Sequence, residues 1–433
     1  MLQEITNIHF IGIGGIGMSA LARLFLHEGR KITGSDREAT DITRTLQKEG
    51  IIVFDTQKKE NIPSDVELVV YTEAMSEDHE EMMAARKLGV PMLSYFEALG
   101  HVANEYYLIA VAGTHGKTTT AAMLTDILEK EGLDPTAIIG SLRSKTGSNF
   151  KAGKSKYAIV EACEYKRNFL SLTPDVLVIT NIEAEHLDYY KDLGDVQSAF
   201  RELCSQIREG GFVVANTKDS NVKPVLDGVD VTVVNYCDYF DPLLKLSQPG
   251  MHNQMNAAAA SAAAAQIGID QEVAKRALEN FKGTWRRFEY KGEVHLPDGK
   301  ASGAKVYDDY GHHPTEIAAT LQGVRELYPD KKITLVYQPH LGSRTEKLFG
   351  DFVEALRTAD HIILTPIYRA RAESTLNVSS EALAETIRKN HSHTEHLETF
   401  EEIAATIKKN VNENDIVLVM GAGDITKVTT MLI

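Results

Sequence analysis

Residues 107–118 read YLIAVAGTHGKT: the apolar run Tyr107 to Val111 leads into the glycine-rich loop Gly113 to Thr118, and the helical run Thr119 to Lys130 follows. A fully apolar strand, a glycine-rich turn and a helix in this order are typical of an α/β fold with a parallel sheet. Backbone N–H groups of such a loop can cradle phosphates, its lysine can reach the terminal phosphates, and its last threonine can hold Mg²⁺. Val111 stands where a complete Walker loop has its first glycine, so the spacing departs from that motif.

A second glycine cluster lies near the start of the chain. Residues 12–17 read GIGGIG, follow the apolar strand Ile8 to Ile11 and open a helix. Glycines at these positions let the backbone approach a pyrophosphate, which then lies on the helix N-terminus. Asp36 follows about 20 residues later, where an acid can bind a ribose hydroxyl. The pattern alone is typical of an NAD site, a turn without a ligand also fits, and the segment leaves the nucleotide open.

The alternation of strand and helix restarts three times, and 433 residues exceed the size of one ordinary core. We therefore expect three α/β domains, at residues 1–104, 105–286 and 287–433, each with a largely parallel sheet. The expected strands lie at Ile8–Ile11, Ile51–Phe54, Leu68–Tyr71, Tyr107–Val111, Tyr157–Val160, Val176–Thr180, Phe212–Ala215, near Val306, and at Ile333–Tyr337, His361–Leu364 and Ile416–Met420.

The composition is that of an ordinary globular protein, with a formal net charge of −15. An acidic surface repels phosphate backbones, which argues against nucleic acid and anionic membranes as partners. Cys163, Cys204 and Cys237 are far apart and form no C-x-x-C pair, which suits a reducing cytosol. The N-terminus has no signal-peptide pattern, and Ala257 to Ala265 is too short and too weakly apolar to span a bilayer. We expect a cytoplasmic protein without membrane insertion.

Acidic and histidine side chains follow two of the expected strands. Glu161 ends one strand, and His186 comes shortly after the next. The C-terminal ends of parallel strands face one crevice, so both side chains are candidates for the phosphate-loop site. Mg²⁺ takes oxygen ligands readily and imidazole less often, so both are candidate metal or water-shell groups. Glu164, Glu183 and Glu185 fit a solvated surface equally well.

The segment His252 to Asn256 precedes the alanine-rich run. Asn256 fits the N-cap of that helix. It also fits one half of an amide pair, with Asn253, that reads an adenine edge.

The last third of the chain carries three further polar segments. Arg286 and Arg287 stand beside the only tryptophan at the second expected boundary, where they can reach a phosphate. Asp308 to Pro314 contains two acids and two histidines between a strand and a helix, and Gln338 to Arg344 occupies the same position one unit later. Such a concentration of charge is costly for a purely structural turn.

In chain order, these motifs resemble those of the Mur ligases of peptidoglycan synthesis. The strings are HFIGIGGIGMSALA at His9, GTHGKTTT at Gly113, EACEY at Glu161, TNIEAEHLDYY at Thr180, HNQMNAAAA at His252, RRFEYKG at Arg286, DDYGHHPTEI at Asp308 and QPHLGSRT at Gln338. One such string is weakly diagnostic, but eight in family order cover nearly the whole chain.

The resemblance implies an N-terminal Rossmann-like domain for a UDP-sugar, a central P-loop-type domain for ATP and a C-terminal Rossmann-like domain for an amino acid. It implies a ligase that uses ATP and Mg²⁺ to convert the carboxylate of UDP-N-acetylmuramate into an acyl phosphate, which L-alanine then attacks. The first glycine cluster would then bind a UDP pyrophosphate rather than NAD.

The resemblance also assigns roles to individual residues. The catalytic residues would be Lys117, Glu161, His186, His312 and His313, and the metal ligands Thr118, Glu161 and His186. The ATP-binding residues would be Gly113, Thr114, His115, Gly116, Lys117, Thr118, Thr119, Asn253, Asn256, Arg287 and Asp309. The residues for the UDP-sugar and the amino acid would be Gly12, Gly14, Gly15, Gly17, Asp36, Tyr310, His340 and Arg344.

The chain departs from the family pattern in three places. Leu341 stands where many relatives carry a basic residue, which leaves Arg344 as the nearby partner for an amino-acid carboxylate. Residues 236–250 are shorter than the strand-rich excursion common there, so we expect a trimmed peripheral sheet. Glu185 replaces the usual aspartate and keeps its charge.

Three other functions stay open from the sequence. A relative in the same family attaches a recycled tripeptide to UDP-N-acetylmuramate. A nucleotide-dependent dehydrogenase fits the first glycine cluster but leaves the loop at Gly113 without a purpose. A non-catalytic nucleotide sensor needs the loops but not Glu161, His186 and Asp309. We expect a monomer or a weak homodimer.

Overall fold

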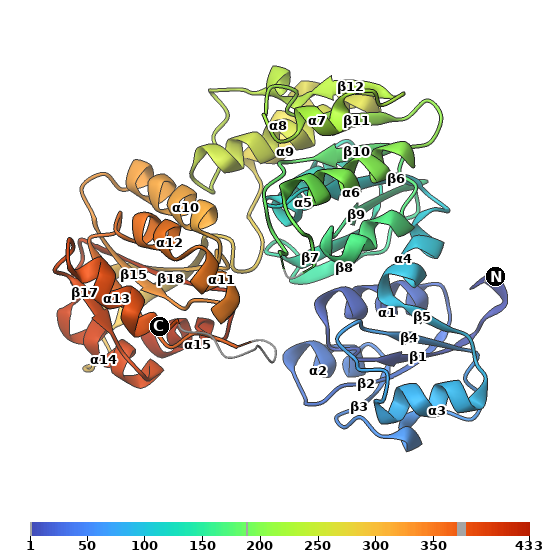
Figure 1. Ribbon diagram of the computed structural model, residues 1–433, viewed down its shortest axis with the longest axis horizontal. Helices are drawn as coiled ribbons and strands as arrows, with labels where there is room; N and C mark the ends of the chain where they lie inside the picture. Colours follow the sequence, from blue (N-terminus) through green and yellow to red (C-terminus); the bar gives the residue numbers. More distant parts are fainter. Residues whose placement is uncertain (1, 188, 370–377) are drawn as a thin grey trace. The chain divides into compact units, whose positions relative to one another are not determined.

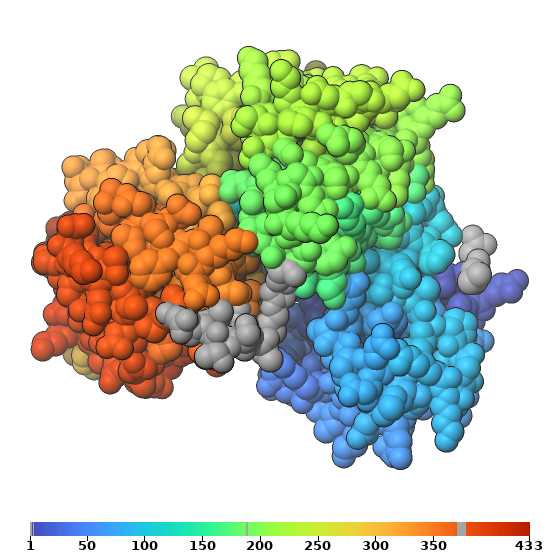
Figure 2. Space-filling view, viewed as in Figure 1, coloured from blue at the N-terminus to red at the C-terminus, as the bar shows by residue number. Residues whose placement is uncertain are grey.

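The computed structural model describes residues 2–187, 189–369 and 378–433. Strands in this part of the chain form three sheets, and helices cover them (Figure 1). The chain separates into two compact units, Met1–Lys245 with Gln254–Lys282, and Leu246–Asn253 with Gly283–Ile433. Figure 2 draws the same view with all atoms. The predicted α/β fold with largely parallel sheets is confirmed.

The first sheet is parallel throughout, in the order β3-β2-β1-β4-β5. Its strands are β1 (Asn7–Ile11), β2 (Lys31–Ser35), β3 (Ile52–Phe54), β4 (Leu68–Tyr71) and β5 (Met92–Ser94). The accompanying helices are α1 (Ile16–His27), α2 (Asp41–Lys48), α3 (Glu80–Leu88) and α4 (Tyr95–Ala103), with the short turns η1 (Leu2–Glu4) and η2 (Lys59–Asn61). The strand order reverses beside β1, so the glycine loop after β1 lies at the switch point where such sheets bind ligands.

The starts of two helices follow from local sequence. Thr40 caps α2 and Ser94 caps α4, and in both the third residue of the helix bonds back to the capping residue. These capping boxes satisfy backbone N–H groups that the first turn leaves open. The Ser94 cap makes Tyr95 the first residue of α4, directly after β5.

The second sheet has the order β12-β11-β10-β6-β9-β7-β8, parallel except for β8. Its strands are β6 (Tyr107–Ala112), β7 (Thr136–Arg143), β8 (Ser148–Lys151), β9 (Tyr157–Glu161), β10 (Val176–Ile179), β11 (Phe212–Ala215) and β12 (Thr232–Asn235). Its helices are α5 (Lys117–Lys130), α6 (Leu193–Ser205), α7 (Lys223–Leu226), α8 (Met251–Gln266) and α9 (Gln271–Glu279), with η3 (Tyr165–Ser171) and η4 (Tyr236–Tyr239). β12 is one edge strand of this sheet. Residues 236–250 are all described and contain no strand, in agreement with the trimmed peripheral sheet that the sequence predicts.

The alanine-rich helix α8 corrects one sequence interpretation. It begins at Met251, so Asn256 lies in its second turn and is not its N-cap. Asn256 is buried, and the alanines from Ala257 to Ala264 are almost completely buried. Small side chains suit a helix that packs closely against its neighbours.

The third sheet has the order β13-β14-β18-β15-β16-β17, and only β13 is antiparallel to its neighbour. Its strands are β13 (Glu289–His295), β14 (Ala301–Asp309), β15 (Lys332–Tyr337), β16 (His361–Leu364), β17 (Thr394–His396) and β18 (Asp415–Met420). Its helices are α10 (Pro314–Leu327), α11 (Gly342–Lys347), α12 (Phe349–Leu356), α13 (Ser380–Arg388), α14 (Phe400–Asn410) and α15 (Thr426–Leu432). Two separate apolar clusters of buried side chains include residues from this sheet. None of the helices in the described ranges has the length and apolar character needed to span a bilayer.

Candidate functional site

The glycine loop between β6 and α5 has a backbone that only glycine accommodates. Gly113 has φ 133° and Gly116 has φ 83°, conformations that side chains disfavour. A Cβ on Gly113 would lie 2.0 Å from Oγ1 of Thr180, and a Cβ on Gly116 would lie 2.3 Å from Oδ1 of Asn256. These glycines therefore let β10 and α8 approach the loop, and they bring Asn256 to its edge.

Hydrogen bonds to the residues after β10 fix the conformation of the loop. The backbone N–H of Thr114 donates to the carbonyl of Asn181 over 3.0 Å, and that of His115 donates to Oδ1 of Asn181 over 2.9 Å. Oγ1 of Thr180 donates to the carbonyl of His115 over 2.6 Å. The N–H of Glu183 donates to Oγ1 of Thr114 over 2.8 Å. Thr180 and Asn181 are supporting residues that sequence reasoning missed, although their place at the end of a neighbouring parallel strand was a signal.

The side chain of Lys117, the first residue of α5, forms an ion pair within its own unit. Its Nζ lies 2.9 Å and 3.1 Å from the two carboxylate oxygens of Glu164. The side chain of Glu164 is 2% exposed, so its interpretation as a solvated surface charge is wrong. Thr119, the third residue of α5, is buried.

Thr118 and Glu161, two of the three predicted metal ligands, are in direct contact. Oγ1 of Thr118 lies 3.0 Å and 2.9 Å from the carboxylate oxygens of Glu161. The N–H of Gly140 on β7 donates to the same carboxylate over 2.7 Å and fixes its orientation. A hydroxyl and a carboxylate at the end of the phosphate loop fit the oxygen ligands that Mg²⁺ takes in nucleotide sites.

His186, the third predicted ligand, lies beside Glu164. Its Nε2 is 3.7 Å from a Glu164 oxygen, and its ring centroid is 4.9 Å from that of Tyr165. Its φ of 54° is a strained conformation for a side chain other than glycine. Such strain gathers at functional sites, and the metal role of His186 stays a prediction.

The first glycine cluster forms the turn between β1 and α1. Gly12 has φ 83°, and Gly15 is the N-cap of α1. The N–H of Gly14 donates to Oδ2 of Asp36 over 2.8 Å, so this carboxylate closes the turn. A Cβ on Gly14 would lie 2.7 Å from the same oxygen. The predicted contact of Asp36 with a ribose hydroxyl stays a prediction.

Gly17 leaves room for Tyr95, a residue that the sequence did not single out. A Cβ on Gly17 would lie 2.7 Å from the Tyr95 ring. Burial raises the pKa of Tyr95, and the nearby acidic groups of Glu161 and Cys163 raise it further. The phenol therefore packs against the start of α1.

In the other unit, Arg286 is a structural residue. It is 3% exposed, lies 3.0 Å from Oδ1 of Asp308, and donates to the carbonyls of Gly421 and Gly423. A buried guanidinium with these partners holds β14 to the loop after β18. The expectation that Arg286 reaches a phosphate is therefore wrong, whereas Arg287 remains partly exposed.

Asp309 ends β14 and is buried. Its two carboxylate oxygens accept from the backbone N–H groups of Phe288 over 2.8 Å and Gly311 over 2.7 Å. Burial raises the pKa of this carboxyl to about 6, against the opposing effect of Arg287 and the two N–H groups. The Arg287 guanidinium lies 5.3 Å from the centre of the Tyr310 ring.

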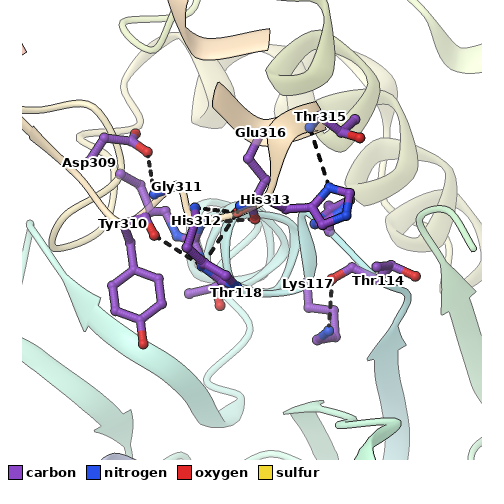
Figure 3. Close-up of polar contacts among 12 residues, drawn as sticks. Thr114, Lys117, Thr118, Asp309, Tyr310, Gly311, His312, His313, Thr315 and Glu316 are labelled. Atoms are coloured by element: carbon purple, nitrogen blue, oxygen red, sulfur yellow. Dashed lines mark hydrogen bonds and ion pairs between the residues drawn. The ribbon is translucent and has the colours of Figure 1, made fainter. Parts of the chain in front are cut away.

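The remaining candidates of this unit follow β14 and β15 in the sequence, and Figure 3 shows Tyr310, His312 and His313 after β14. His313 is the N-cap of α10, and its Nδ1 accepts from the N–H two residues later. Nδ1 of His312 lies 3.1 Å from the carbonyl of Tyr310, and its ring centroid is 5.9 Å from that of His340. Nη1 of Arg344 lies 3.3 Å from Nδ1 of His340. A capping role explains His313, and its catalytic role stays a prediction.

Asn253, the other half of the predicted amide pair, belongs to the same unit as Asp309. It is buried, and its Nδ2 donates to the carbonyl of Pro249 over 2.8 Å.

Comparison with known proteins gives consistent results for every part of the chain. Three family models match in succession: the Mur ligase family catalytic domain at residues 7–107, the Mur ligase middle domain at 111–239, and the Mur ligase glutamate ligase domain at 286–423.

Two curated relatives are similar over their full lengths, and both are UDP-N-acetylmuramate–L-alanine ligases. The one from Agathobacter rectalis is 39% identical, over 98% of this chain and 96% of the relative. The one from Caldanaerobacter subterraneus subsp. tengcongensis is 40% identical, over 99% of this chain and 97% of the relative. The crystal structure of the UDP-N-acetylmuramate–alanine ligase of Thermotoga maritima superposes with a TM-score of 0.81 at 29% identity, over 98% of this chain and 97% of that chain. This chain belongs to the Mur ligase family.

Proposed function

We propose that this protein is an ATP-dependent ligase that joins L-alanine to the carboxylate of UDP-N-acetylmuramate in peptidoglycan precursor synthesis. The observation that carries the proposal is the similarity of 39–40% identity, along essentially the whole chain, to ligases of that name. The dehydrogenase alternative leaves the loop at Gly113 and the Thr118–Glu161 pair without a role.

The chemistry explains the need for ATP. A carboxylate resists attack by an amine at neutral pH, because its leaving group would be an oxide. In the proposed reaction a carboxylate oxygen attacks the γ-phosphorus of ATP and ADP leaves, which gives an acyl phosphate. The amine nitrogen of L-alanine then attacks the carbonyl carbon, the carbon–oxygen bond to phosphate breaks, and the nitrogen loses a proton.

The phosphate loop supplies the groups for the first step. Backbone N–H groups at the start of α5 and the Lys117 ammonium would spread the charge of the transferred phosphoryl group. Thr118 and Glu161, already in contact, would hold Mg²⁺, which neutralises charge on the phosphate oxygens when it is bound. Asn256 at the edge of the loop would contact the nucleotide.

The first glycine loop would hold the UDP-sugar. Gly12 and Gly14 shape the turn, and the exposed Gly15 caps the N-terminus of α1, whose positive end favours a pyrophosphate. Asp36, fixed by Gly14, would accept from a ribose hydroxyl.

The C-terminal unit would supply the remaining contacts. Arg287 and Asp309 are assigned to the nucleotide. Tyr310, His312, His340 and Arg344 are assigned to the amino acid, with Arg344 as the partner of its carboxylate.

The test is phosphate release with UDP-N-acetylmuramate, Mg²⁺-ATP and a panel of amino acids, with the product mass measured in parallel. We expect release with L-alanine and a product heavier by one alanine residue. Turnover with the tripeptide but with no small amino acid would assign the protein to the recycling reaction, and consumption of NADH instead of ATP would contradict both. We also infer a cytoplasmic location and a monomer or weak homodimer. Sedimentation of the purified protein would test the oligomeric state, and cell fractionation the location.

A further inference from the structure

Glu164 is a buried carboxylate inside the candidate ATP site. It lies three residues beyond Glu161, at the N-cap of η3, and its side chain is 2% exposed. Burying a charge is costly unless the charge is paired and hydrogen-bonded. Glu164 therefore requires a fixed cationic partner.

That partner is Lys117. Its ion pair with Glu164, together with two backbone carbonyls, occupies all the N–H donors of the ammonium. Nζ of Lys117 lies within 3.1 Å of four oxygens: the carbonyls of Gly113 and Thr114 and both carboxylate oxygens of Glu164. An ammonium has three N–H donors. A new hydrogen bond from Nζ to a phosphate must therefore replace one of these four contacts.

The backbone of Glu164 is anchored, which keeps its carboxylate beside the loop. The backbone carbonyl of Glu164 accepts from the N–H of Arg167 over 2.9 Å and from the hydroxyl of Tyr190. The side chain of Tyr190 is itself only 2% exposed. Nε2 of His186 lies 3.7 Å from Oε1 of the carboxylate. The carboxylate is thus an acceptor that stays close to the loop.

We propose that Glu164 is a positioning residue that competes with the ATP phosphates for Lys117 and thereby sets the affinity for ATP. The proposal rests on the proposed role of Lys117 in binding those phosphates. Phosphate oxygens replace part of the contact between Lys117 and Glu164, and the part that remains aims Nζ at the transferred phosphoryl group. A carboxylate this close also repels the polyphosphate, which weakens binding further.

Three consequences follow for a variant with an amide in place of the carboxylate. Glu164→Gln keeps the size of the side chain and an oxygen acceptor but removes the charge. ATP should then bind about tenfold more tightly, because a like charge beside the polyphosphate is gone and Lys117 is no longer held by an ion pair. The kcat should fall, because the contact that aims Nζ is weakened. AMP, which lacks the terminal phosphates, should bind both proteins equally.

The experiment measures the dissociation constants of ATP and AMP by calorimetric titration of the full-length protein, and kcat and KM in the ligase assay. The variants are Glu164→Gln, Glu164→Asp and Lys117→Ala. Asp134→Asn is the matched control, because it also removes one carboxylate paired with a lysine, Lys151, on the same sheet. We expect tighter ATP binding only in the two Glu164 variants, and unchanged binding in the control.

Unchanged or weaker ATP binding by folded Glu164→Gln overturns the proposal. If that variant does not fold, Glu164→Asp carries the test with the same expected direction, because its shorter side chain no longer reaches Nζ with both oxygens. Lys117→Ala separates this inference from the proposed function: ATP binding as tight as in the wild type would contradict the role of Lys117 itself.

Discussion

Removing the Lys117 side chain should destabilise the protein as well as inactivate it. The side chains of Lys117 and Glu164 are only 14% and 2% exposed. Lys117→Ala therefore leaves a buried carboxylate without its counter-ion. Removal of one partner from a buried ion pair costs about 3–5 kcal/mol, whereas replacement of both by apolar groups of similar size is often neutral or stabilising. We therefore expect Lys117→Ala to lose about 3–5 kcal/mol and the double variant Lys117→Met/Glu164→Leu to lose much less.

The assay is urea denaturation at pH 7, followed by far-UV circular dichroism, for the wild type, Lys117→Met, Glu164→Leu and the double variant Lys117→Met/Glu164→Leu, with Lys117→Ala measured alongside. The quantity of interest is the coupling energy of the double-mutant cycle, since it removes effects that each substitution has alone. Phosphate release by Lys117→Ala should fall below detection at every ATP concentration. If the double variant is destabilised by the sum of the two single effects, the carboxylate and the ammonium are not coupled, and the reasoning from burial is refuted.

Three further predictions concern other parts of the same unit. Glu161→Gln should raise the Mg²⁺ concentration for half-maximal activity by about 10–100-fold, and an unchanged Mg²⁺ titration would remove Glu161 from the metal site. Gly17→Ala should raise the KM for the UDP-sugar roughly tenfold, because the new Cβ would lie 2.7 Å from the Tyr95 ring, while the KM for ATP stays constant. A KM for the UDP-sugar equal to that of the wild type would show that this packing does not matter for the substrate. Burial lowers the pKa of His9 from 6.5 to about 4, so the stability that His9 contributes is present above pH 6.5 and is lost as the pH falls toward 4. Over that window the loss is about 3 kcal/mol, and urea denaturation of His9→Gln at pH 7 and pH 5 should show a weaker pH dependence than the wild type.

Much of the fold was predictable because it depends on local pattern. The strands Phe212–Ala215 and His361–Leu364 have the predicted bounds, and β6 extends the predicted apolar run by one residue. Continuous apolar runs of this length, broken by glycine turns, describe buried parallel strands well. The phosphate loop was predictable for a similar reason, since its glycines are required by the backbone itself.

The errors concern side chains whose environment is set by residues far away in sequence. Glu164 looks like a surface acid next to Glu161, and only the approach of Lys117, 47 residues earlier, makes it a buried ion pair. Arg286 and Arg287 are neighbours of the same type, yet the fold buries the first against Asp308 and leaves the second partly exposed. Asn256 was a credible N-cap because the start of α8 carries no strong local signal. Tyr95 and Gly140 escaped notice because nothing in their own segments marks them.

The most direct test of carboxylate activation by ATP uses UDP-N-acetylmuramate labelled with ¹⁸O in both oxygens of its carboxylate. The protein is incubated with this substrate, Mg²⁺-ATP and L-alanine, and the released phosphate is analysed by mass spectrometry. An acyl-phosphate route predicts that each released phosphate carries one ¹⁸O, while the other label stays in the new amide. Alanylated product accompanied by unlabelled phosphate would contradict the account.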